Sequence, residues 1–146
     1  GTNTESKSVN PIGTKVANLN RNGYHDNQNQ LDVWQTDGLL EVKSKPEQAM
    51  KAWQDASNAL EDRARSYLDI NCGHCHSQHG PASSSGLHLV TEETDSFRLG
   101  IFKTPIAAGR GTGNRLYDTY PGNEKKSILI FRISPYFLFG VSCWGH

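Results

Sequence analysis

Two cysteines separated by two residues, with a histidine directly after the second, occur within residues 71–76, which read Asn-Cys-Gly-His-Cys-His. At this spacing the thiols of Cys72 and Cys75 can each add to one vinyl group of a haem, because two intervening residues place the sulfurs at neighbouring vinyls. The next residue, His76, then falls beneath the ring, where its imidazole can bind the iron. The motif therefore predicts one covalently attached c-type haem, with His76 as the proximal iron ligand.

A helix is expected to run directly into this motif. Asn58 can cap the first turn, and Glu61 follows three residues later in the capping-box position. Apolar side chains then recur at the spacing of one helical face, at Leu60, Ala64, Tyr67 and Leu68. This stripe would pack beside a haem ring; without a haem it is the buried face of an ordinary amphipathic helix.

Two more helices are expected, one before and one after the motif. Ser44 can cap the earlier helix, which places Met50 and Trp53 on one face. Asn123 can cap the later helix over residues 124–133. The predicted fold is therefore mostly α: a small cytochrome c-like domain of about three helices around one haem.

The chain before these helices has a different character. Residues 1–43 are expected to form an irregular, polar N-terminal arm or connector, because they are rich in asparagine and offer few side chains for a core. Within the arm, residues 14–19 show the weak alternation of a short strand, and residues 30–40 could form a helical turn packed onto the domain. The cytochrome-like domain would then span residues 44–146, including an atypical tail.

Composition bears on the class of function. The chain has 15 basic and 15 acidic residues and a formal net charge of +0, which supports neither nucleic-acid binding nor electrostatic membrane anchoring. No run approaches the roughly 20 apolar residues that span a bilayer. Hydrophobic residues make up only 35% of the chain, so a haem is expected to fill part of the core. The chain starts at Gly1 without a signal peptide, and we interpret it as processed, trimmed or partial.

Several segments together resemble a family of bacterial periplasmic c-type cytochromes, in which the cytochrome module forms the C-terminal part of a larger secreted protein. These segments lie at residues 67–76, 80–83, 85–87, 107–111, 117–123 and 127–129, with residues 19–21 and 29–32 similar to the upstream connector. The resemblance implies a non-enzymatic electron carrier that serves redox partner proteins. It also implies a location in the periplasm or at the cell surface of a bacterium.

The sixth ligand of the iron is left open by the sequence. Members of the family continue to a methionine ligand, whereas residues 134–146 contain none. His88 and His146 are the candidate donors in this chain, and a histidine from a second copy in a homo-oligomer is a third possibility. An open site could instead support peroxidase-like chemistry. Met50, the only methionine, is expected in the core, and the other histidines are expected at the surface: His25, His74 and His79.

Other side chains are expected to line the haem. Arg110 and Arg115 lie in a glycine-rich segment, where they could pair with the haem propionates or remain solvated. Phe102 is expected to pack against the ring. Further apolar side chains are expected to join it: Ile106, Leu129 and Phe131.

A zinc-binding structural module is the alternative to the haem protein. Cys72 and Cys75 would supply two sulfurs, and Cys143 and His146 a third sulfur and a nitrogen, which makes an acceptable tetrahedral set. The long gap between the two pairs and the haem-like flanks of the motif argue against this reading.

Overall fold

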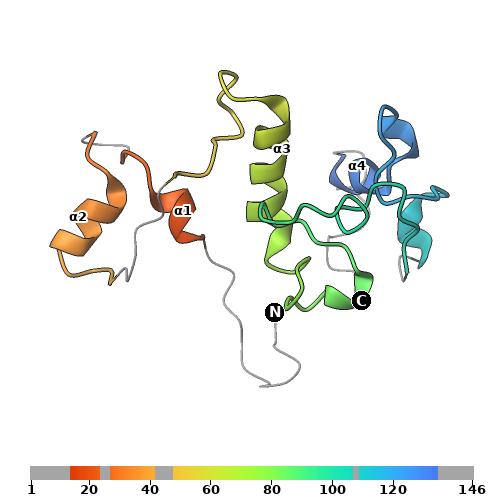
Figure 1. Cartoon of the computed structure of the whole chain (residues 1–146), viewed down its shortest axis with the longest axis horizontal. Helices are drawn as coiled ribbons and strands as arrows, with labels where there is room; N and C mark the ends of the chain where they lie inside the picture. Colours follow the sequence, from red (N-terminus) through yellow and green to blue (C-terminus); the bar gives the residue numbers. More distant parts are fainter. Residues whose placement is uncertain (1–13, 24–26, 42–47, 107–108, 135–146) are drawn as a thin grey trace.

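The computed structural model of the chain describes residues 14–23, 27–41, 48–106 and 109–134. In this part of the chain helices are the only regular elements longer than a single bridge, which confirms the mostly helical class. The α-helices are α1 (Val16–Leu19), α2 (Gln30–Thr36), α3 (Leu60–Leu68) and α4 (Ile128–Ile133). Figure 1 shows α3 at the centre, with α1 and α2 on one side and α4 on the other. None of the described helices has the length and apolar character that a membrane span requires.

Helix α3 leads into the motif, as predicted. It continues without a break into a π-helix, Asp69–Gly73, which carries Cys72. The expected apolar stripe is not buried: Leu60 and Ala64 are exposed, and Tyr67 and Leu68 are half-buried. The buried side chains near the end of the helix are polar, Ser66 and Asp69. The helix therefore packs through its C-terminal half, where it delivers Cys72.

The cap of α3 differs from the prediction. Ala59, not Asn58, occupies the N-cap position, and it makes no side-chain capping bond. The Asn58 amide instead donates to the Asp55 carboxylate at 3.0 Å, and the Ser57 N–H donates to the same group at 2.9 Å. The Ser57 bonds are the main reason that the pKa of Asp55 lies below its usual value. This local turn satisfies the polar side chain that would otherwise have capped the helix.

The helix predicted to place Met50 and Trp53 on one face is wrong, because residues 48–59 are not helical. Residue 44, its predicted cap, lies outside the described part. The Met50 N–H donates to the Ala17 carbonyl at 3.0 Å, and the Met50 sulfur accepts from the Asn18 amide at 2.9 Å. These contacts attach Met50 to α1, where it is half-buried rather than part of the core.

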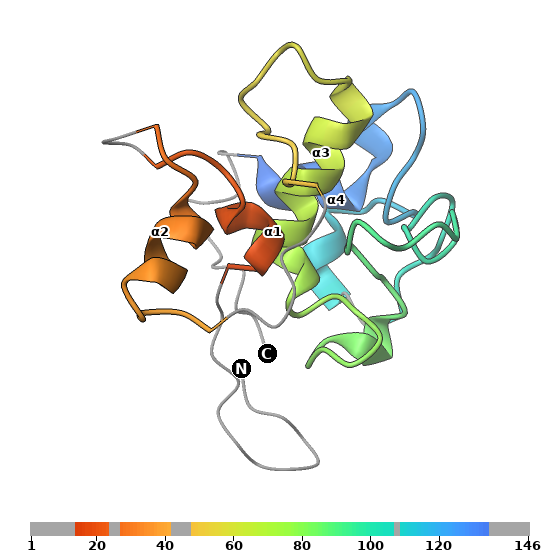
Figure 2. The same ribbon diagram turned by 60° about the vertical axis from the view of Figure 1, so that its left-hand side comes forward.

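The segment before α3 is more ordered than an irregular arm. The strand expected over residues 14–19 is wrong, because residues 16–19 form α1, where the Asn18 side chain accepts from the Lys15 N–H at 2.9 Å. The helical turn expected over residues 30–40 is present as α2, capped by Asn29, and its Leu31 is fully buried. In Figure 2 α1 and α2 remain neighbours, with α1 nearer to α3.

The later helix is confirmed only at residues 128–133, and the cap predicted at Asn123 is wrong, because Asn123 precedes a separate 3-10 helix and makes no side-chain capping bond. Helix α4 follows this short 3-10 helix, Glu124–Lys126, and Ser127 occupies the N-cap position of α4. The apolar core of the described residues is small; its buried members are Leu31, Leu87, Leu89 and Ile128.

Candidate haem-attachment site

The motif forms one continuous turn at the end of the π-helix. The N–H groups of Cys75 and His76 both donate to the Cys72 carbonyl, at 3.0 and 2.8 Å. Both cysteine side chains are half-buried, and no disulfide joins them. The two thiols and the imidazole therefore leave the backbone from a single turn, as covalent haem attachment requires.

The chain after the motif folds back over this turn. The Ala82 N–H donates to the Cys75 carbonyl at 3.1 Å, and the Leu89 N–H donates to the His76 carbonyl at 2.8 Å. A Cβ atom placed on Gly80 would overlap the Cys75 carbonyl group and would lie 2.9 Å from the Ser77 hydroxyl. Only glycine allows this approach, so the loop holds the motif turn through backbone contacts.

The hydrogen bonds around Ser85 favour one tautomer of His76. The Ser85 hydroxyl donates its single proton to the Ala82 carbonyl at 2.7 Å and accepts from the Leu87 N–H at 3.2 Å. Its oxygen lies 3.3 Å from Nδ1 of His76, and it can only accept there because its proton is already used. This arrangement favours the tautomer with the proton on Nδ1, which leaves the Nε2 lone pair for a metal.

The surroundings of His76 also favour a neutral ring. Burial lowers the pKa of His76 below its usual value, and the nearby Arg132 guanidinium lowers it further. Asp118 acts in the opposite direction but does not outweigh these two causes. A neutral imidazole is the form that binds iron, so charge and tautomer favour the same role.

His88, one of the two predicted donors for the sixth position, is buried and already paired. Its Nδ1 lies 3.1 Å from the Glu93 carboxylate, whose pKa is held below its usual value by the Asp95 N–H and then by His88. His88 belongs to residues 85–89, the segment that supports His76 through Ser85 and Leu89. His146 lies outside the described residues, so the sixth ligand stays a prediction.

The predicted propionate partners have different surroundings. Arg110 is exposed in the 3-10 helix Gly109–Thr112. Arg115 donates to the backbone carbonyls of Lys125 at 2.7 Å and Gly113 at 2.9 Å, and its guanidinium lies 4.0 Å from the centre of the Phe131 ring. Arg115 thus links the loop to α4. Arg110 is exposed, so its guanidinium is the better placed of the two to bind a haem propionate.

Phe102 presents its ring to solvent, with 52% of the residue exposed. Its φ of 52° is unusual for a bulky side chain, and its N–H donates to the Thr119 carbonyl at 3.0 Å. Tyr117 and Tyr120 contact the ring edge to face, with centroids 5.8 and 5.2 Å away. The ring is therefore in contact with two tyrosines and otherwise exposed, and its contact with a haem stays a prediction.

Ile106 is a second uncovered apolar side chain near the motif. It is 70% exposed, and its Cδ1 lies 3.8 Å from the position of a Cβ atom on Gly86, the neighbour of Ser85. Leu129 and Phe131, the other expected ring contacts, are half-buried. The exposed side chain of Ile106 thus lies next to Gly86, in the segment that supports His76.

The remaining histidines partly follow the prediction. His79 is exposed, as expected for a surface residue. His74 is half-buried, and its Nδ1 atom is inaccessible to solvent without a hydrogen-bond partner among the described residues. The surface assignment of His74 is therefore only partly right, since one of its ring nitrogens is buried. His25 lies outside the described residues.

Two contributors to the site were missed by sequence reasoning. Ser85 lies in a run of three serines, and nothing in the sequence distinguishes it from its neighbours. Lys103 and Asp118 form a buried ion pair with a Nζ–Oδ2 distance of 3.1 Å. A lysine inside the apolar stretch of residues 101–106 was the available signal that this charge is buried.

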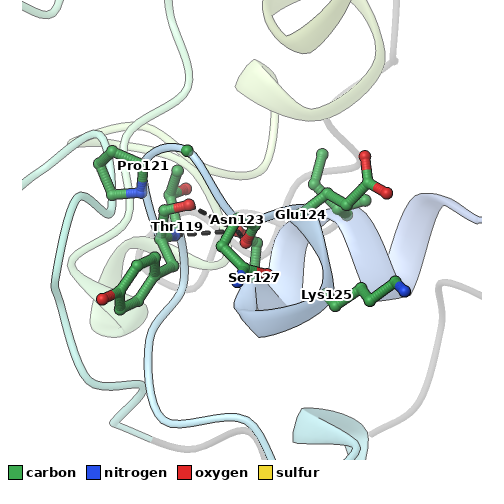
Figure 3. Close-up of a pocket in the computed structure, with 9 residues that line it drawn as sticks. Thr119, Pro121, Asn123, Glu124, Lys125 and Ser127 are labelled. Carbon is green, nitrogen blue, oxygen red and sulfur yellow. Dashed lines mark hydrogen bonds between the residues drawn. The ribbon is translucent and has the colours of Figure 1, made fainter.

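A surface hollow lies beside the start of α4, and Figure 3 shows side chains along its rim, including Thr119, Asn123 and Lys125. No residue of the motif lines it, and its hydrogen bonds link the turn to Ser127, whose hydroxyl accepts from the Tyr120 N–H at 2.9 Å. These hydrogen bonds stabilise the turn, and the hollow shares no lining residue with the motif.

The described residues contain no group of three or more histidine, cysteine or acidic side chains arranged to hold a metal ion. Cys143 and His146, on which the zinc alternative depends, lie outside this part of the chain. Comparisons with protein-family models, with curated proteins and with solved structures find no match to this chain. The function of the site therefore has to be inferred from its geometry.

Proposed function

We propose that this chain is a c-type cytochrome module that carries one haem, attached through Cys72 and Cys75, with His76 as the proximal iron ligand. The observation that carries this proposal is the hydrogen bond between Nδ1 of His76 and the Ser85 hydroxyl at 3.3 Å. An imidazole held in this way resembles metal-binding histidines in general, whose second nitrogen is bound by a neighbouring group.

The rest of the site fits a haem. Two half-buried thiols leave the same turn as His76, and the uncovered side chains of Phe102 and Ile106 offer apolar surface that a porphyrin could cover. A small apolar core in the described residues is also what a domain built around a prosthetic group requires, because the ring replaces side chains.

The bound haem would supply one-electron chemistry, and the protein would tune it. Cys72 and Cys75 would fix the ring, His76 would present Nε2, and the segment behind His76 would hold that imidazole in place. Phe102 and Ile106 would exclude water from the ring. The chain would then exchange electrons with redox partner proteins in the periplasm or at the surface of a bacterial cell.

The test is the intact mass of the protein after it is produced in a host that attaches haem to exported proteins. Denatured protein should have the mass of the chain plus one haem, and the reduced protein should show the absorption bands of a c-type haem. The double variant Cys72→Ser/Cys75→Ser should have the mass of the bare chain. A bare-chain mass for the unaltered protein, with zinc found by elemental analysis, would overturn the proposal and favour the zinc alternative.

A further inference from the structure

Residues 89–91 connect the two ends of the turn that carries the motif. The Leu89 N–H donates to the His76 carbonyl at 2.8 Å, and the Thr91 N–H donates to Oδ2 of Asp69 at 2.8 Å. Asp69 is the first residue of the π-helix that leads into the motif, and His76 is the last residue of the motif. A short segment far along the chain is therefore bonded both before and after the two cysteines.

The Asp69 carboxylate holds one end of this segment through a single oxygen atom. None of its side-chain surface is exposed, and Oδ2 also accepts from the Thr91 hydroxyl at 3.1 Å. Oδ1 is buried without a hydrogen-bond partner among the described residues. A carboxylate in such surroundings is costly unless a cation lies beside it. That cation is Lys15, whose Nζ lies 2.7 Å from Oδ2.

Lys15 belongs to the chain that precedes the predicted haem domain. It occupies the N-cap position of α1, where its N–H donates to the Asn18 side chain at 2.9 Å. Hydrogen bonds between α1 and the segment before α3 attach this helix to the rest of the fold. The Lys15 ammonium also lies 3.5 Å from the carboxylate of Glu92, the residue that follows residues 89–91. Lys15 thus contacts both the π-helix and the end of the segment that is bonded to it.

We infer that Lys15 is a positioning residue for the proximal ligand: it holds the Asp69 carboxylate, and through it residues 89–91, where they fix the backbone of His76. This inference rests on the proposed haem attachment. It makes the chain before residue 44, expected from the sequence to be an arm or connector, a working part of the haem site. Groups behind a ligand histidine orient it toward the metal, so loss of this support should change how the imidazole meets the iron.

The decisive variant replaces the ion pair by apolar side chains. Lys15→Met/Asp69→Leu leaves no unpaired buried charge, so it should fold and load haem. The Thr91 N–H loses its charged acceptor, and we expect its hydrogen exchange, measured by NMR in the haem-loaded protein, to become at least about tenfold faster. The Leu89 amide, which is bonded to the His76 carbonyl, should lose protection with it.

The orientation of His76 is measured in the ferric protein with saturating cyanide. Cyanide then occupies the sixth position, so the spread of the haem methyl resonances in the NMR spectrum reports the plane of the proximal imidazole. We expect this spread to change in Lys15→Met/Asp69→Leu. An ion pair that only stabilised the fold would leave the spread as it is in the unaltered protein. That result, in a folded and haem-loaded variant, would overturn the inference.

Single substitutions supply the matched controls. Lys15→Met should change the methyl spread, whereas Lys15→Arg keeps a cation beside Asp69 and should preserve it. The exposed Lys51→Met removes the same side chain next to the residue that attaches α1, and it should also preserve the spread. A change as large in Lys51→Met as in Lys15→Met would contradict the inference. Absence of haem from the unaltered protein would instead reject the proposed function, and the inference with it.

Discussion

On the motif side of the molecule, residues 69–91, hydrogen bonds and ion pairs hold buried side chains such as Asp69 and His88, whereas on the open side, the described residues between 100 and 132, large apolar side chains face solvent. The Asp69 carboxylate is fully buried and accepts from the Thr91 N–H at 2.8 Å and from Lys15 Nζ at 2.7 Å. Phe102 and Ile106, by contrast, are more than half exposed. Polar contacts therefore hold much of the motif side, whereas the open side exposes large apolar side chains.

This difference indicates that the motif side of the proposed haem site is ordered by the polypeptide itself. The Arg65 guanidinium strengthens the motif side further, donating to the carbonyls of Thr91, at 2.9 Å, and Glu93. Ligand residues held by such contacts are preorganised for a metal. The open side would gain its packing only when a haem ring covers it. Substitutions on the motif side should therefore disturb iron ligation or stability, and substitutions on the open side should reduce stability only in the haem-loaded protein.

The largest effect is expected on the motif side from His76→Ala, because it removes the proposed proximal ligand. The thiols remain, so haem should still attach in part, but the iron should lose its stable axial coordination and the absorption spectrum should change. The exposed His79→Ala is the control and should leave the spectrum as it is. His74→Ala should also change it little. A spectrum as disturbed in His74→Ala as in His76→Ala would contradict the ligand assignment.

A smaller loss is expected from Gly80→Ala, which tests the support of the motif rather than its chemistry. The added methyl group would overlap the Cys75 carbonyl group, and backbone cannot move aside as a side chain can. Overpacking of this kind typically costs about 1–3 kcal/mol of stability, and we expect the upper part of that range. Thermal unfolding of the haem-loaded protein, followed by circular dichroism, measures the loss.

Gly111→Ala is the matched control for that comparison. A Cβ atom on Gly111 would meet the end of the Arg132 side chain, whose central carbon lies 3.1 Å away and which can move. The cost there should stay within about 0.5 kcal/mol, as for most surface substitutions. Equal losses in the two variants would mean that the backbone contact at Gly80 does not hold the motif.

The sequence predicted the motif side better than the open side, for a physical reason. The motif spacing and the helix before it depend on residues that are neighbours along the chain, so both could be inferred directly. The support of His76 by Ser85 depends on how the loop of residues 77–84 closes, and the pair of Lys103 and Asp118 depends on two segments meeting in space. Local patterns gave a wrong prediction where a tertiary contact decided the structure. Met50 was predicted in a helix of its own, but its N–H is bonded to the Ala17 carbonyl of α1.

The smallest expected effect, and the sharpest test of the comparison, is Ile106→Ser on the open side. Ile106 is 70% exposed, so in the bare polypeptide the substitution should cost little. If a haem covers this side chain, the unaltered protein gains part of the roughly 1.5–3 kcal/mol that full burial of an isoleucine provides, and the variant loses it. We therefore expect a loss of about 1–2 kcal/mol in the haem-loaded protein.

Leu60→Ser is the matched control, because Leu60 is 75% exposed in the first turn of α3, away from the motif end of the helix. Its loss should stay within about 0.5 kcal/mol whether or not haem is attached. Chemical unfolding of haem-loaded Ile106→Ser and Leu60→Ser, each against unaltered protein, separates the two cases. Equal losses would place Ile106 outside the ring contact and would remove it from the surface that the haem is proposed to cover, leaving Phe102 as the apolar contact to test next.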